Sequence, residues 1–103
     1  MCGIAGIVSS ERSLEPILFE MMDSLQHRGP DNNSSYINKN VGLAHTRLSI
    51  IDLSEKSNQP LHDSSNRYVI VFNGEIYNYK EIKSKLLSKG IIFNTDGDAE
   101  VLL

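Results

Sequence analysis

The sequence has one cysteine, Cys2, and no tryptophan. A single cysteine excludes an internal disulfide framework and is typical of a protein in a reducing compartment, so we expect a cytoplasmic location. The apolar runs are too short to span a bilayer, and the N-terminus lacks the long apolar region of a secretory signal. The sequence therefore predicts no membrane partner.

Clusters of one charge are also missing. Lysine and arginine are scattered, and the formal net charge of the 103 residues is −3. Nucleic-acid-binding proteins normally carry a basic patch, so we expect no nucleic-acid partner. The three histidines, His27, His45 and His62, show no metal-ligand spacing, and no GxGxxG or GxxxxGK[ST] motif is present. We expect no metal site and no cofactor within these residues.

Hydrophobic periodicity in the first half predicts one helix among strands. Residues 3–10 are rich in isoleucine and valine and end in serines, as a short buried strand does. Apolar residues over 14–25 recur at helical spacing after an N-cap at Ser13. Two further strands, 34–38 and 41–47, are expected to pair through a turn at the intervening residues.

The second half continues the alternation of strands and helices. We expect a loop over 48–66 with apolar anchors at Leu48, Ile50 and Ile51, followed by a strong strand over 67–72. A helix is expected after an Asn78/Glu81 capping box, and a strand over 91–93 follows it. A last helix is expected after a Thr95/Asp98 capping box. This order defines an α+β chain. Because the last helical pattern has only begun at Leu103, we expect a fragment of a longer polypeptide.

Cys2 follows the initiator methionine directly. Removal of Met1 would give one residue a thiol, with a pKa of about 8.5, and an α-amine, with a pKa of about 7.7–8.0. Such a residue can activate its own nucleophile, which is the arrangement of N-terminal-nucleophile catalysis. The alternative is a structural cysteine at the start of a strand.

Three other positions also allow two interpretations each. Asn73-Gly74 fits a β-turn, or an oxyanion hole made of a side-chain amide and a backbone N–H. Arg47 fits a surface ion pair, or a forked grip on a carboxylate. Asp98 fits a helix cap, or a partner for an ammonium group.

Five motifs in order carry a resemblance to a known family. They are MCGI at the N-terminus, HRGPD at 27–31, LAHTRLSIID at 43–52, VFNGEIYNY at 71–79 and TDGDAEV at 95–101. Together they resemble the glutamine amidotransferase domain of class II enzymes, most closely that of glutamine-hydrolysing asparagine synthetase. The resemblance implies the N-terminal-nucleophile hydrolase fold, a four-layer α/β/β/α sandwich of two antiparallel sheets. Residues 1–103 would form the N-terminal part of this domain.

The resemblance also implies the catalytic roles. Cys2 would attack the side-chain amide of L-glutamine with its own α-amine as the base, and a glutamyl thioester would then be hydrolysed. Asn73 and the Gly74 N–H would stabilise the oxyanion. If Met1 were retained, the amine would be blocked and the site would be dormant.

Substrate recognition is implied in the same way. Arg47 would bind the α-carboxylate of glutamine and Asp98 its α-ammonium, while Glu75 and the backbone around Ile50 would line the pocket. His27 and His45 would be structural, because the terminal amine is the base. Gly97 departs from relatives that often carry serine or cysteine there, which would loosen the ammonium end.

The remaining expectations concern the whole protein. The resemblance implies a synthetase domain, absent from this chain, that uses ATP and magnesium and receives the ammonia. A homodimer is expected for the full-length protein. The alternatives are a non-catalytic glutamine-binding or structural module, and the amidotransferase domain of another asparagine-synthetase-like enzyme.

Overall fold

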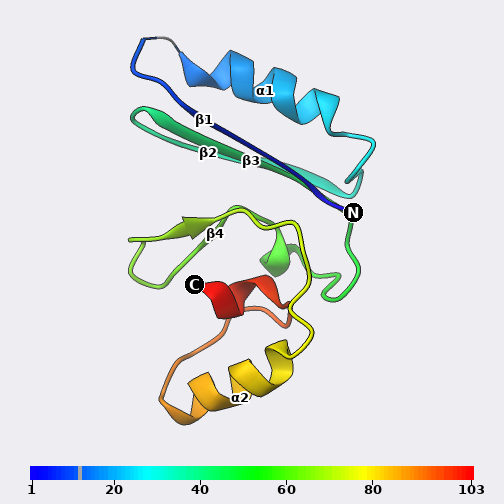
Figure 1. Ribbon diagram of the computed structural model, residues 1–103, viewed down its shortest axis with the longest axis vertical. Coiled ribbons are helices and arrows are strands. Elements are labelled where there is room, and N and C mark those ends of the chain that lie inside the picture. Colours follow the sequence, from blue (N-terminus) through cyan, green and yellow to red (C-terminus); the bar gives the residue numbers. More distant parts are fainter. Residues whose placement is uncertain (12) are drawn as a thin grey trace.

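The computed structural model describes residues 1–11 and 13–103. Its first half is a three-stranded antiparallel sheet in the order β1-β3-β2, formed by β1 (Gly3–Val8), β2 (Asn32–Asn38) and β3 (Val41–Arg47). Helix α1 (Leu14–Ser24) lies across one face of this sheet (Figure 1). The long central strand β3 is therefore supported by a neighbour on each side and by a helix above it.

Strand alternation decides which face of the sheet is covered. Small residues on the α1 side allow close packing, since a Cβ at Gly42 would lie 3.2 Å from the Leu18 side chain. Leu18 is completely buried there, as is Ala44 of β3. On the opposite face Ile4 and Val8 remain 46% and 71% exposed. The face that carries no helix is thus free to form the wall of a site.

The second half begins below this sheet and consists of short elements. They are η1 (Glu55–Ser57), the hairpin of β4 (Leu61–His62) and β5 (Val69–Ile70), helix α2 (Tyr79–Ser88) and η2 (Ala99–Leu102). In Figure 1, β4 and the red C-terminal turn lie between the three-stranded sheet and α2. Among the described residues, no helix is long and apolar enough to cross a membrane.

The α+β class is confirmed: the described residues form two antiparallel sheets and two α-helices, which is compatible with an amidotransferase of the N-terminal-nucleophile type. The strands expected at 3–10, 34–38 and 41–47 are present with small shifts at their ends. Lys39, in the expected turn, has a left-handed φ of 54°.

One expected strand is present but shorter than predicted, and a second is wrong. The segment 67–72 pairs only at Val69 and Ile70, because the Phe72 N–H donates to the Gln59 side chain at 2.5 Å instead of to a neighbouring strand. The segment 91–93 is not a strand in the structure. There the Ile91 N–H donates back to the Leu86 carbonyl at the end of α2, and Ile92 is 84% exposed.

Helix α2 begins after Asn78, as expected, but the side-chain hydrogen bonds expected for the two capping boxes do not form. Glu81 forms an exposed ion pair with Lys85 at 3.0 Å, and neither Asn78 nor Asp98 makes a side-chain cap hydrogen bond. Thr95 instead bonds to Glu100. The expected apolar anchors Ile50 and Ile51 are also wrong, since they are 64% and 46% exposed.

Candidate active site

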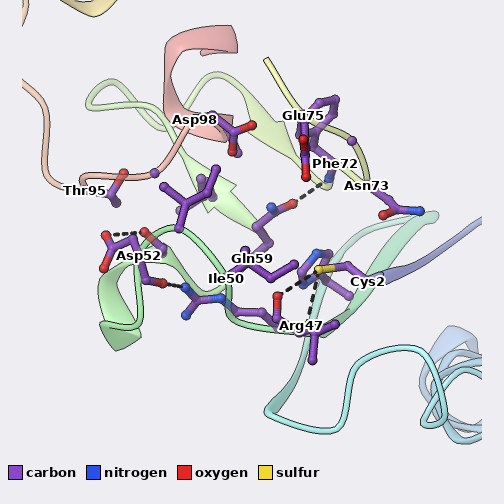
Figure 2. Close-up of a pocket in the computed structure, with 18 of the residues that line it drawn as sticks. Cys2, Arg47, Ile50, Asp52, Gln59, Phe72, Asn73, Glu75, Thr95 and Asp98 are labelled. Carbon is purple, nitrogen blue, oxygen red and sulfur yellow. Dashed lines mark hydrogen bonds between the residues drawn. The ribbon is translucent and has the colours of Figure 1, made fainter. Parts of the chain in front are cut away.

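A cavity of about 410 Å³ lies where the Cys2 end of the three-stranded sheet faces the loops of the second half. Figure 2 shows side chains from these separate segments pointing toward it. All seven residues expected from the sequence line this one cavity: Cys2, Arg47, Ile50, Asn73, Gly74, Glu75 and Asp98. The fold therefore brings together positions up to 96 residues apart, from Cys2 to Asp98.

The Cys2 thiol is fixed by the first residue beyond β3. The Leu48 N–H donates to Sγ at 3.3 Å, and the thiol donates to the Leu48 carbonyl at 3.7 Å. The Arg28 Nε–H donates to the Cys2 carbonyl at 3.0 Å. Hydrogen bonds thus hold both the side chain and the backbone of Cys2 in place. Because Cys2 is a free, half-buried cysteine, its sulfur remains accessible from the cavity.

The HRGPD segment supports this corner of the site, a role that the sequence did not reveal. Besides Arg28, Asp31 donates its N–H to the Arg47 carbonyl at 2.9 Å and accepts the Ser49 N–H at 2.7 Å. Gly29 packs so closely on the Thr46–Arg47 peptide that a Cβ would overlap backbone atoms. The only indication in the sequence was the motif itself.

Arg47 is 7% exposed and reaches from the end of β3 into the loop after it. Nη1 donates to the Ser54 carbonyl at 2.7 Å and to Asn58 Oδ1 at 2.6 Å, and Nη2 donates to the Asp52 carbonyl. Within the described residues, Nε makes no hydrogen bond. This N–H is a donor of the planar guanidinium that the loop does not use, and a guanidinium donor of this kind suits a carboxylate.

Asp98 enters the cavity from the segment before η2. Its Oδ2 accepts the Ile76 N–H at 2.9 Å, which ties this segment to the residues that follow Asn73-Gly74. Within the described part of the chain, Oδ1 makes no hydrogen bond. One carboxylate oxygen thus positions Asp98, and the other is free to accept from a ligand.

Asn73 and Gly74 do not connect two strands. They follow β5 as a bend, and the φ of Gly74 lies outside the left-handed region. A Cβ at Gly74 would lie 2.8 Å from the Phe72 ring, so glycine is needed for close approach. The pair is therefore not the turn of a hairpin, and its role as an oxyanion hole stays a prediction. Glu75 and Ile50 are exposed residues of the lining.

His45 also lines the cavity, next but one to Arg47 on β3. Its ring is 1% exposed, and neither nitrogen makes a hydrogen bond within the described residues. Burial lowers the pKa of His45, the nearby Phe72 backbone opposes this shift and the Arg47 charge adds to it, and together they bring the pKa from 6.5 to about 4. The ring is consequently neutral at pH 7. Within the same ranges, no cluster of three His, Cys, Asp or Glu side chains is arranged to bind a metal ion.

Known proteins are similar to this chain along its whole length. Residues 1–103 match the family model described as a glutamine amidotransferase domain. The chain is 43% identical to glutamine-hydrolysing asparagine synthetase 1 of Bacillus subtilis, covering 100% of the chain and 17% of that protein. It is 39% identical to the glutamine-hydrolysing asparagine synthetase of Zea mays, covering 99% of the chain and again 17% of the relative.

The α+β fold is compatible with a glutamine amidotransferase domain, and the chain belongs to the glutamine amidotransferase domain family. Within that family, it is homologous to part of the glutamine-hydrolysing asparagine synthetases. The chain spans about a sixth of the length of these relatives.

Proposed function

We propose that this chain hydrolyses L-glutamine to glutamate and ammonia, with Cys2 as the nucleophile after removal of Met1. The observation that carries the proposal is the single cavity lined by Cys2, by the Asn73-Gly74 pair and by two opposite charges, Arg47 and Asp98. A nucleophile, oxyanion donors and two anchors for a zwitterion are the parts that this reaction requires.

The chemistry would proceed through a thioester. The Cys2 α-amine takes the thiol proton, and the sulfur attacks the amide carbon of glutamine. The oxyanion accepts hydrogen bonds from the Asn73 side chain and the Gly74 N–H. The protonated amine then gives its proton to the leaving nitrogen, and ammonia departs. Water, deprotonated by the same amine, hydrolyses the glutamyl thioester, and the thiol regains its proton.

Substrate selection would follow from the two charged anchors. The unused Nε–H of Arg47 suits the α-carboxylate of glutamine, and Oδ1 of Asp98 suits its α-ammonium. Each anchor is already positioned by hydrogen bonds to other segments. Glu75 and Ile50 line the same cavity and would limit its shape. A site with both charges binds an amino acid in one orientation and presents its side-chain amide to Cys2.

We further propose that residues 1–103 are the N-terminal part of a four-layer sandwich whose remaining strands lie elsewhere in the protein. A separate synthetase domain would use ATP and magnesium to activate a carboxylate such as aspartate and would receive the ammonia. The sequence of this chain contains neither a GxGxxG nor a GxxxxGK[ST] motif for binding nucleotide phosphates, so we assign the ATP-dependent steps to that separate domain. The full-length protein would be a cytoplasmic asparagine synthetase-like ligase and would form a homodimer.

The test is the intact mass of the purified protein before and after exposure to a diazoketone analogue of glutamine. We expect the loss of Met1 and one covalent adduct, both accompanied by glutaminase activity. The matched control is Cys2→Ser, which nearly preserves the shape of the side chain and should neither be labelled nor turn over glutamine. A protein that loses Met1 but shows neither adduct nor activity would refute the proposal and favour a non-catalytic module.

A further inference from the structure

Asp52 is a cavity residue to which the proposed mechanism assigns no role. Its Oδ1 accepts the Ser54 N–H at 2.8 Å, and its Oδ2 accepts the Ser57 hydroxyl at 2.6 Å and the Asp96 N–H at 2.9 Å. These hydrogen bonds, that of Ser57 first, hold the pKa of the Asp52 carboxyl well below its usual range. Both oxygens are therefore ionised acceptors across the physiological pH range.

The partners of Asp52 belong to two segments that lie far apart in the sequence. Ser54 and Ser57 are in the loop that follows β3, whereas Asp96 is 44 residues further along the chain. The backbone carbonyl of Asp52 accepts a hydrogen bond from Arg47. Asp52 thus contacts the proposed carboxylate anchor, Arg47, directly (Figure 2). Through its side chain it also binds Asp96, in the segment that immediately precedes the proposed ammonium anchor, Asp98.

Gly97 allows this contact to be close. A Cβ at Gly97 would lie 3.2 Å from the Ser57 hydroxyl and 3.8 Å from Asp52 Cβ, so the two segments already touch at this point. The expectation that Gly97 loosens the ammonium end is not supported by this packing. The absence of a side chain at Gly97 brings the Asp96–Asp98 backbone against the Asp52 loop.

We propose that Asp52 is a positioning residue that fixes the spacing between Arg47 and Asp98, and thereby the selectivity of the cavity for an α-amino acid. This inference rests on the proposed glutaminase function. A zwitterion binds both anchors at once only when their separation matches the separation of its own charges. A hydrogen-bonded link between the two loops sets that separation before the substrate arrives.

The chain offers a matched control in Asp63. This aspartate also accepts hydrogen bonds from a serine hydroxyl, Ser65, and from a backbone N–H, that of Tyr68 at 2.9 Å. All of its partners lie within five residues, and Asp63 is not part of the cavity. Asp63→Asn therefore removes a loop carboxylate of the same kind without affecting the link between the anchors.

The experiment compares steady-state glutaminase kinetics of the full-length protein and its variants. The substrates are glutamine and glutaramate, the analogue that lacks the α-amino group. Asparagine keeps the shape of Asp52 but replaces one acceptor oxygen by an NH2 donor, which would face an N–H or O–H donor. We expect Asp52→Asn to raise the KM for glutamine about tenfold or more while kcat changes less than about threefold. The KM for glutaramate should hardly change, and Asp63→Asn should match the wild type.

A double-mutant cycle identifies the residue through which Asp52 acts. If Asp52 positions Asp98, the variant carrying both Asp52→Asn and Asp98→Asn should bind glutamine no more weakly than Asp98→Asn alone. Independent, multiplicative effects would overturn the inference, and so would a loss of kcat with unchanged KM. If Asp52→Asn does not fold, Ser57→Ala removes one bond to the same carboxylate and must raise the KM in the same direction.

The failure of this inference can be distinguished from the failure of the proposed function. A wild-type protein that hydrolyses glutamine, together with an Asp52→Asn variant that matches Asp63→Asn, refutes only the role of Asp52. A protein without glutaminase activity is examined by calorimetric titration of Cys2→Ala with glutamine. If Cys2→Ala binds glutamine and the added Asp52→Asn substitution weakens this binding, the positioning role of Asp52 is supported even without turnover. The absence of glutamine binding refutes both proposals.

Discussion

Gly3 offers a test of how closely the proposed nucleophile, Cys2, is packed against the sheet. It is the first residue of β1, follows Cys2 directly and pairs with Thr46 of β3. A Cβ at Gly3 would lie 2.5 Å from Thr46 Oγ1 and 2.9 Å from Leu25 Cβ. Both distances are shorter than a normal van der Waals contact, so Gly3→Ala must displace at least one neighbour.

The size of the effect follows from what would be displaced. Thr46 is completely buried, and its hydroxyl accepts the Gly3 N–H at 3.1 Å and donates to the Leu25 carbonyl at 3.2 Å. Overpacking of a filled core costs about 1–3 kcal/mol, and a lost hydrogen bond costs about 0.5–1.5 kcal/mol more. We therefore expect Gly3→Ala to lower the free energy of unfolding by about 2–4 kcal/mol.

Gly6, on the same strand, is the matched control. A Cβ at Gly6 would lie 3.5 Å from the Leu43 side chain and 3.7 Å from the Gly42 carbonyl, which are ordinary contacts. Glycine within a strand is less stable than alanine by about 0.5–1 kcal/mol, because it loses more backbone entropy on folding. Gly6→Ala should therefore leave stability unchanged or raise it slightly.

The assay is urea denaturation of both variants, combined with the rate at which the diazoketone labels Cys2. Gly3→Ala should unfold at lower urea and also label more slowly, since a shift of β1 moves the sulfur away from Leu48. Equal stability of the two variants would refute the packing argument. If Gly3→Ala labels more slowly but is as stable as the wild type, the added methyl group affects the reaction of Cys2 with the diazoketone and not the packing of the fold.

Three further predictions test other parts of the site. His45 has its pKa lowered from 6.5 to about 4 in the folded state, so the unfolded state binds this proton first. The free energy of unfolding should fall by about 1–3 kcal/mol as the pH drops from about 6.5 to 4.5, and His45→Gln should reduce this slope in urea titrations. Asn73→Ala should lower the kcat for glutamine about 10²–10³-fold with a smaller change in KM, as measured by steady-state glutaminase kinetics. Arg47→Lys should lower stability by about 1–3 kcal/mol and also raise KM, because lysine cannot reproduce the hydrogen bonds of the guanidinium to the loop; unchanged urea midpoints would contradict this.

The sequence predicted the first half of the fold better than the second. The helical pattern of residues 14–24 and the strand pattern of residues 41–47 can both be read from neighbouring residues. The partner strands of the three-stranded sheet also lie close to them in the sequence. The segments 67–72 and 91–93 have strong strand propensity but only a short partner or none among the described residues. A strand needs a partner for its backbone groups, and propensity alone does not supply one.

The cavity residues were predicted from motifs rather than from periodicity. The sequence identifies residues whose reactive or charged groups suggest a function without any knowledge of their neighbours, such as Cys2, Arg47 and Asp98. Arg28 and Asp52 were missed as individual residues because their contribution is geometric. Each acts through a hydrogen bond to a backbone group, and such a bond becomes visible only when the two segments are seen together.

This difference explains why motifs in this chain are longer than the chemistry requires. Within HRGPD, no residue is assigned a contact with glutamine, yet Arg28 orients the Cys2 carbonyl and Asp31 binds the segment just after Arg47. Within LAHTRLSIID, Arg47 is the proposed carboxylate anchor, and Asp52 links the Arg47 loop to the segment before Asp98 by hydrogen bonds. Short loops supply little rigidity of their own, so a cavity made of them needs these cross-connections to hold two charges at a fixed separation. Substitution of the connecting residues should therefore alter substrate selectivity before it alters the chemical step.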